Sequence, residues 1–270
     1  NTTSTGNYYT YITGGSWELT SSMESAKYKL GGANDKTSKD GGSYTGLYEL
    51  GTNLTLLPLD YGDTSLVGYW KFDEGTGTTA YDASGHGNNG TLNNGPSYTT
   101  GKVGSYALSF DGSDDDVYCG GSSSLNSTSY TISVWFKTTA ISPDNQTAQR
   151  MVSLSRASGS TKISLMMRVD KPKLIANGGE IETSSNTVSN DGNWHNFTTT
   201  YNGSSFLLYL DGSQKNSVSG VLSSAFQGCT IGSLLGSPSQ GYFDGYIDDV
   251  RIYNRVLSAA EISAIYNLAK

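Results

Sequence analysis

The fold is decided by one stretch near the end of the chain, residues 243–266, which reads FDGYIDDVRIYNRVLSAAEISAIY. It opens on an Asp-Gly turn and continues as an alternating strand, which predicts that the even-numbered residues of 246–252 share one face. Ser258 precedes Glu261 by the spacing of a capping box, so a short helix should follow the strand. A strand that leads into a small packed helix indicates the last piece of a closed β architecture.

Two adjacent carboxylates lie in the middle of this strand, at Asp248 and Asp249. Successive side chains of a strand point to opposite faces, so at least one of the two should face inward or into a rim loop. A carboxylate that leaves water needs a partner, and a cation is one candidate.

The composition favours an all-β protein. The chain has 270 residues, of which 15% are charged, and it contains 34 glycines and 19 tyrosines. Small, polar and aromatic residues in these amounts are typical of many short strands joined by tight turns. The formal net charge of -7 argues against nucleic acid or an anionic membrane surface as a partner, and makes cations more plausible.

Five further blocks precede the C-terminal stretch in a fixed order. They read VGYWKFDEGTGTTAYDASGHGNNGTL from Val67, ALSFDGSDDDVYC from Ala107, YTISVWFKT from Tyr130, GNWHNFTTTYNGSSFLLYLDG from Gly192 and CTIGS from Cys229. Together the blocks resemble the laminin-G-like, concanavalin-A-like jelly-roll family. This resemblance implies a two-sheet antiparallel jelly-roll sandwich over residues 65–270 and an extracellular adhesion or recognition module.

Residues 1–64 do not fit the jelly-roll pattern and form a separate small α+β or β-hairpin segment in our interpretation. Two aromatic runs flank Gly14 and Gly15, which predicts a hairpin, and residues 21–30 indicate one or two helical turns. Residues 8–55 resemble the C-terminal region of type IV pilins and pseudopilins, although the hydrophobic N-terminal helix of that family is absent. No apolar run approaches 18 residues, so we expect no membrane span and no signal peptide in this chain.

The family resemblance suggests a calcium site. Calcium takes six to eight oxygen ligands, and the matching positions are Asp73, Asp82, Asp248 and the carbonyls of the glycine-rich loop from Gly85 to Asn88. In the family a structural calcium commonly bridges the N-terminal and C-terminal strands.

The pattern leaves alternatives open at this site. Either Asp248 or Asp249 can be the ligand, and Glu74 can replace Asp73. The same acids can also simply cap turns and face solvent.

Cys119 and Cys229 are the only cysteines, and each falls on an expected strand. If they pair, the disulfide closes a long loop and stabilises the fold by roughly 4 to 5 kcal/mol in the chain-entropy model. The alternative is two buried free thiols.

Carbohydrate binding is the common non-catalytic use of this fold, and exposed aromatic rings usually serve it. Trp70, Trp135 and Trp194 match core positions of the family, so tyrosines and polar loops would have to bind the sugar. The candidate residues are Tyr118, Asp144, Asn145 and Tyr242. Each tyrosine can equally be an ordinary half-buried strand residue.

The sequence argues against an enzyme. Glucanases of this fold carry two catalytic carboxylates on one strand, in a Glu-x-Asp-x-(x)-Glu run. The nearest approach here is Glu180 and Glu182, which lack the central Asp and lie in a loop-like context. His195 matches a packed structural histidine of the family, and His86 has no second histidine nearby for a zinc site.

We therefore predict a non-catalytic recognition module that binds a glycan or a cell-surface ligand at the cell surface or on a pilus, where other pilin-like subunits would be further partners. The alternative hypothesis is a structural subunit of an extracellular filament that binds no sugar. A third hypothesis, a carbohydrate-active enzyme, is weakened by the missing acid pair.

Overall fold

The structure is a computed structural model of the chain. It describes residues 8–12, 16–21, 48–51, 63–121, 125, 127–141, 148–155, 161–176, 179–183, 189–222, 228–234 and 241–269. The helical turns expected after Ser21 lie outside these residues. The chain divides into two compact units, of which one comprises residues 1–64, 258–268 and 270, and the other residues 65–257 and 269. The domain boundary between residues 64 and 65 stays a prediction.

In the first unit, three described strands form an antiparallel sheet in the order β1 (Tyr8–Ile12), β2 (Ser16–Ser21) and β3 (Tyr48–Gly51). The hairpin predicted around Gly14 and Gly15 is confirmed, because Tyr11 pairs with Trp17 across it. The helix of this unit is α1 (Ala259–Leu268).

The capping box at the start of α1 is confirmed. The backbone N–H of Ser258 donates to Oε2 of Glu261 at 2.6 Å, and the N–H of Glu261 donates to Oγ of Ser258 at 3.3 Å. These two hydrogen bonds satisfy backbone donors that the first turn of a helix leaves without partners.

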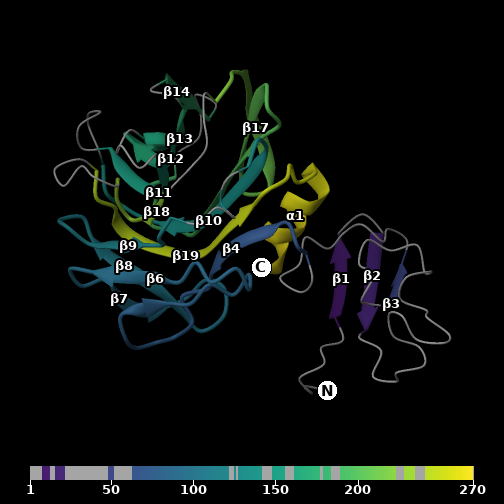
Figure 1. Ribbon diagram of the computed structural model, residues 1–270, viewed down its shortest axis with the longest axis horizontal. Helices are drawn as coiled ribbons and strands as arrows, with labels where there is room; N and C mark the ends of the chain where they lie inside the picture. The colour runs from purple at the N-terminus through teal and green to yellow at the C-terminus, as the bar shows by residue number, and fades with distance from the viewer. Residues whose placement is uncertain are drawn as a thin grey trace. The chain divides into compact units, whose positions relative to one another are not determined.

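The second unit is an all-β sandwich of two antiparallel sheets, as the sequence predicts (Figure 1). The β10–β19 sheet is built from β4 (Leu66–Trp70), β7 (Ser97–Thr100), β8 (Tyr106–Asp111), β10 (Tyr130–Lys137), β15 (His195–Tyr201), β16 (Ser205–Leu210), β17 (Ser213–Ser219) and β19 (Asp244–Tyr253). Its strand order is β17-β16-β15-β10-β19-β8-β7, and β4 also pairs with β19.

The β11–β18 sheet forms the other layer. Its strands are β5 (Thr79–Ala80), β6 (Gly90–Asn93), β9 (Asp116–Tyr118), β11 (Gln149–Ser155), β12 (Thr161–Arg168), β13 (Lys171–Ala176), β14 (Gly179–Glu182) and β18 (Gly228–Ile231). They lie in the order β14-β13-β12-β11-β18-β9-β6-β5. Glu180 and Glu182 therefore lie on a strand, which corrects the loop-like context that the sequence suggested.

The hydrophobic core fills the space between the two sheets. Alternate residues of each strand point into it, such as Val134 and Phe136 of β10 and Leu165 of β12. Trp70, which matches a core position of the family, and Phe72 are both fully buried in it.

Strand β19 changes its inward face at a bulge, and here the sequence-based expectation is wrong. Asp249 has a φ of 49°, and the pairing of β19 with β10 shifts register at this point. As a result Ile247, Val250 and Ile252 all belong to the core, so residues 246–252 do not present their even-numbered members on one face. An extra residue in one strand of a pair has this effect, because it reverses the alternation beyond it.

Candidate functional site

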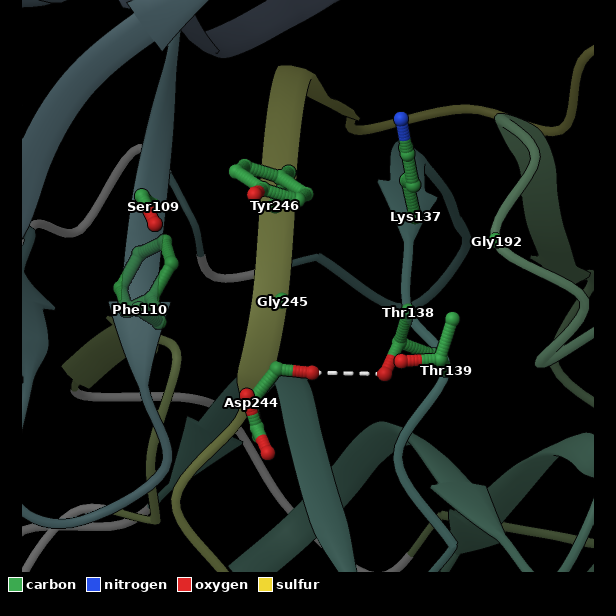
Figure 2. A pocket seen from close by; sticks show the side chains of 9 residues that line it. All are labelled: Ser109, Phe110, Lys137, Thr138, Thr139, Gly192, Asp244, Gly245 and Tyr246. Atoms are coloured by element: carbon green, nitrogen blue, oxygen red, sulfur yellow. Dashed lines mark hydrogen bonds between the residues drawn. The ribbon is translucent and has the colours of Figure 1, made fainter.

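A pocket of about 330 Å³ opens on the β10–β19 sheet, and Figure 2 shows its lining. The lining residues come from β8, the end of β10, the start of β19 and the loop before β15. They are Ser109, Phe110, Lys137, Thr138, Thr139, Gly192, Asp244, Gly245 and Tyr246.

The wall of the pocket is a row of side chains that runs across three strands. Tyr246 of β19 pairs directly with Ser109 of β8 on one side and with Lys137 of β10 on the other. The residues next to them, such as Leu108, Phe136 and Ile247, belong to the core, so the row lies on the opposite face of the sheet. The pairing thus places a hydroxyl group, an aromatic ring and an ammonium group side by side.

The aromatic ring of Tyr246 lies between two further groups. Nζ of Lys137 is 5.5 Å from the centroid of the ring, and the indole ring of Trp194 has its centroid 6.3 Å away at an interplanar angle of 51°. Both Tyr246 and Trp194 are partly exposed, so the core position that the family pattern implied for Trp194 is wrong. Aromatic rings in such a position offer an apolar surface with polar groups at its edge.

The end of the pocket at Asp244 is shaped by contacts to the backbone of β19 and β10. The hydroxyl of Thr138 donates to the carbonyl of Asp244 at 2.6 Å, as the dashed line in Figure 2 marks. Gly245 has a φ of +144°, and a Cβ atom there would lie 2.3 Å from the carbonyl oxygen of Lys137. A side chain at this position would push β19 away from β10, so the shape of the pocket depends on this glycine.

The loop that carries Gly192 and Trp194 is fixed by a histidine between two carboxylates. Nδ1 of His195 is 2.8 Å from Oδ2 of Asp211, and Nε2 is 3.2 Å from Oδ1 of Asp191. Burial lowers the pKa of His195, but its hydrogen bonds and the charges of Asp211 and then Asp191 outweigh burial and raise the pKa above the ordinary value. His195 therefore holds the loop beside the pocket, consistent with the structural role that the sequence suggested.

Two of the predicted calcium ligands hold one turn between β7 and β8. Oδ1 of Asp73 accepts the backbone N–H groups of Ser105 at 2.6 Å and Tyr106 at 3.0 Å. Oδ2 of Asp248 accepts the N–H groups of Lys102 at 2.7 Å and Val103 at 2.9 Å. The structure therefore brings Asp73 and Asp248 to the same turn from two sides.

Asp248 carries an unusual buried oxygen. The residue is fully buried, and its Oδ1 has no hydrogen-bond partner. Burial raises the pKa of Asp248 to about 7, although the N–H donors of Val103 and Lys102 act in the opposite direction. Asp249, the other candidate ligand, instead forms an ion pair with Arg251.

The remaining predicted ligands belong to the glycine-rich loop. Both carboxylate oxygens of Asp82 accept backbone N–H groups at 2.9 Å. Oδ1 accepts those of Tyr69 and Ser84, and Oδ2 accepts that of Asn88. The carbonyl of Asn88 accepts the indole N–H of Trp70 at 2.9 Å. Gly85 has a φ of +84°, as the sharp bend of this loop requires. The carboxylate of Asp82 thus organises its own loop.

The described residues also contain a cluster of three acids, Asp111, Asp114 and Asp115. One carboxylate oxygen of each lies within 4.8 Å of the others. The backbone N–H of Asp111 donates to Oδ2 of Asp115 at 3.0 Å. Burial is the first cause that raises the pKa of Asp115, and the charges of the neighbouring acids add to it.

The two cysteines face each other across neighbouring strands. Cys119 follows β9 and Cys229 lies on β18, and the N–H of Cys119 donates to the carbonyl of Cys229 at 2.9 Å. Both thiols are buried and free in the structure, which matches the alternative of free thiols. The disulfide itself stays a prediction.

Two of the sugar-binding residues proposed from the sequence, Tyr118 and Tyr242, do not line the pocket. Tyr118 is 40% exposed and lies on β9, in the other sheet. Burial raises the pKa of Tyr242, and the charges of Asp116 and Asp114 raise it further. Asp144 and Asn145 lie outside the described residues.

No sequence pattern indicates the pocket at Tyr246 and Lys137. Each residue by itself reads as an ordinary strand residue. Their proximity depends on the register between β10 and β19, which are far apart in the chain.

The fold and a family model together define the class of this protein. A laminin G model described as the concanavalin A-like lectin/glucanases superfamily matches residues 111–263. The chain therefore belongs to this superfamily. No curated protein sequence matches the chain.

Solved structures of low sequence identity share the fold. The binding domain of Paraclostridial mosquitocidal protein 1 has a TM-score of 0.59 at 17% identity, over 75% of this chain and 52% of that one. Domain 4 of AbnA, an extracellular arabinanase from Geobacillus stearothermophilus solved in complex with arabinotriose, has a TM-score of 0.55 at 17% identity, over 76% of this chain and 98% of that one.

A third similar structure is the receptor binding domain of botulinum neurotoxin mosaic serotype C/D, with a TM-score of 0.56 at 15% identity, over 76% of this chain and 51% of that one. The chain thus spans about half the length of the two toxin domains. Among the described residues, no helix combines the length and apolar character that crossing a membrane requires.

Proposed function

We propose that this chain is an extracellular, non-catalytic carbohydrate- or surface-binding module, and that its sugar site is the pocket around Tyr246. The observation that carries the proposal is the row of Ser109, Tyr246 and Lys137 across three strands. A sugar ring presents an apolar face and a rim of hydroxyl groups, so it fits an aromatic ring flanked by polar groups.

The size and construction of the pocket support this proposal. A volume of about 330 Å³ lies at the lower end of the roughly 300 to 1,000 Å³ that ligand pockets occupy, and suits one or two sugar rings. The wall is built on strands, and Gly245 fixes the approach of β19 to β10. A site on such a support keeps its geometry without a ligand. Membership of the lectin/glucanases superfamily and the likeness to an arabinanase domain solved with arabinotriose agree with a glycan as the ligand class.

A glycan array followed by isothermal titration calorimetry tests the proposal. The Tyr246→Ala variant should lose at least about tenfold in affinity for the glycan that the array selects, because the ring is the main apolar contact. The matched control is Tyr118→Ala, which removes another exposed tyrosine from the opposite sheet and should leave the affinity within about twofold. Equal losses in both variants would reject the sugar site at Tyr246. No binding to any glycan, together with ordered self-association, would reject sugar binding in favour of a structural filament subunit.

The non-catalytic part of the proposal rests on how the nearest acid pair is used. Glu180 and Glu182 of β14 are both bound to Lys173 of β13, and Glu180 also pairs with Arg168. Carboxylates held in ion pairs are poor general acids, and the hydrogen bond to Lys173 is the main cause that lowers the pKa of Glu182. Release of reducing sugar from any member of a polysaccharide panel would overturn this assignment.

Placement at a cell surface or on a pilus, with pilin-like subunits as partners, is part of the same proposal and rests on the resemblance of residues 8–55. Immunolabelling of intact cells and of sheared surface filaments tests this placement.

We also propose a structural calcium ion at the turn between β7 and β8, with Asp248 and Asp73 as ligands. The buried Oδ1 of Asp248, which has no partner, fits a cation, because an ionised carboxylate is costly to bury alone. When bound, calcium would supply positive charge that compensates this carboxylate and would join β19 to the chain that follows β4. Asp82 and the loop from Gly85 to Asn88 stay predicted ligands.

A further inference from the structure

We propose that the pocket selects sugars that carry a carboxylate group, such as uronic or sialic acids, and that Lys137 binds that carboxylate. This inference rests on the proposed function, because it names the chemical class of ligand for the same pocket.

The ammonium group of Lys137 is placed for such a role. It lines the pocket beside Tyr246, and no carboxylate in the described part of the chain forms an ion pair with it. The side chain is only partly exposed, so its charge is less screened than that of a fully solvated lysine. A lysine in a pocket that forms no ion pair with a carboxylate of the described residues favours an anionic ligand.

The other charged group of the lining sets the direction in which a ligand would bind. Asp244 lies two residues before Tyr246 on β19 and is exposed, and Figure 2 shows it at the other end of the lining from the ammonium group of Lys137. A ligand carboxylate is repelled by Asp244 and attracted by Lys137, whereas sugar hydroxyl groups can donate to Asp244. The sugar would therefore lie on Tyr246 with its carboxylate toward β10 and its hydroxyl groups toward Asp244.

The experiment compares matched pairs of probes that differ in the carboxylate. One arm uses trigalacturonic acid and its methyl ester, and the other uses 3′-sialyllactose and lactose, so the two arms distinguish uronic from sialic acids. Affinities are measured by isothermal titration calorimetry at constant ionic strength. The acid of at least one pair should bind about tenfold or more tightly than its neutral partner.

Three variants connect that preference to Lys137. Lys137→Gln should remove the preference for the acid, so that the acid and its neutral partner bind this variant within about threefold of each other, and Lys137→Arg should retain the preference because the charge is kept. Lys171→Gln removes a charge from β13 in the other sheet and should change neither affinity.

The outcomes separate this inference from the proposed function. Equal affinity for acid and neutral sugars, with both lost in Tyr246→Ala, overturns the inference and leaves the sugar site standing. If the protein binds neutral glycans from the array and neither acid probe, the inference is likewise overturned and the sugar site stands. If Tyr246→Ala changes the affinity for no sugar, both the carboxylate preference and the sugar site at Tyr246 are overturned.

Discussion

Asp249 and Arg251 form a buried ion pair on strand β19. Oδ1 of Asp249 accepts hydrogen bonds from both Nε and Nη2 of Arg251, each at 3.2 Å, and the two residues are 1% and 2% exposed. The guanidinium group also lies 4.4 Å from the ring centroid of Tyr69 and donates to its hydroxyl at 2.9 Å. The two residues lie two apart on β19, so their side chains share one face, opposite to Val250 and Ile252 of the core.

Removal of Asp249 should destabilise the fold strongly. In Asp249→Ala the guanidinium group of Arg251 stays buried without its carboxylate, and we expect a loss of about 3 to 5 kcal/mol in the free energy of unfolding. Urea denaturation measures it. The double variant Asp249→Ala with Arg251→Met should recover a large part of that loss, since no charge is then left behind. A single-variant loss below about 1 kcal/mol would contradict a buried pair.

The bulge at Asp249 shows how far the sequence predicts the fold. Alternation along residues 243–253 identified the strand, and the spacing of Ser258 and Glu261 identified the start of α1, because both signals are local. The bulge left no such signal, since an Asp can adopt a positive φ but rarely does so. The faces beyond Asp249 were therefore assigned wrongly.

The candidate site was harder to predict, because it depends on contacts between distant segments. Lys137 and Tyr246 belong to different blocks of the sequence, and a register of β10 against β19 shifted by one residue would place them on opposite faces. Asp73 and Asp248 were identified through the family pattern. The family pattern did not identify the turn at residues 102–106 that both carboxylates bind.

The capping box of α1 gives a prediction of smaller size. Ser258→Ala removes the oxygen that accepts the N–H of Glu261, and we expect it to lower the free energy of unfolding by about 1 kcal/mol, within a range of roughly 0.5 to 2. Ser258→Thr retains a capping hydroxyl and should cost less. The measurement is again urea denaturation, with circular dichroism at 222 nm following helix content. Equal effects of the two substitutions would exclude the cap as the cause.

Calcium binding predicts a specific pattern of thermal stability. Excess calcium at about 100 times its Kd should stabilise the chelated wild-type protein by about 2.7 kcal/mol, and thus raise the Tm. Asp248→Asn should abolish that response, because an amide replaces the charged ligand, and Asp73→Asn should weaken it. Elemental analysis of the untreated protein gives an independent measure of bound metal.

The acidic cluster of residues 111–115 supplies the control for calcium. Asp114→Asn removes an exposed charge there and should leave the calcium response intact. If Asp114→Asn abolishes the response and Asp248→Asn does not, the ion binds at the cluster and our assignment is wrong. An absence of bound metal together with an unchanged Tm in calcium would dismiss the ion altogether.

The contacts of His195 predict that part of the stability depends on pH. The pKa of His195 is raised in the folded chain above its ordinary value of about 6.5, because Asp211 and Asp191 favour the imidazolium form despite burial. A group whose pKa is raised by folding stabilises the fold fully below the unfolded pKa and loses this contribution as pH rises through the folded pKa. The free energy of unfolding should therefore contain a contribution from His195 that is fully present below about pH 6.5 and is lost as pH rises through the higher pKa of the folded chain.

Comparison with a neutral side chain isolates this contribution. His195→Gln can still donate one hydrogen bond but carries no charge at any pH, so wild type and variant should differ more at about pH 5.5 than at about pH 8.5. His86→Gln is the matched control, because His86 lies exposed in the glycine-rich loop and makes a 3.3 Å contact to the hydroxyl of Ser84. A His195→Gln difference that is constant across the pH range, or that grows with pH, would mean that Asp191 and Asp211 position the loop beside the pocket without help from the charge of His195.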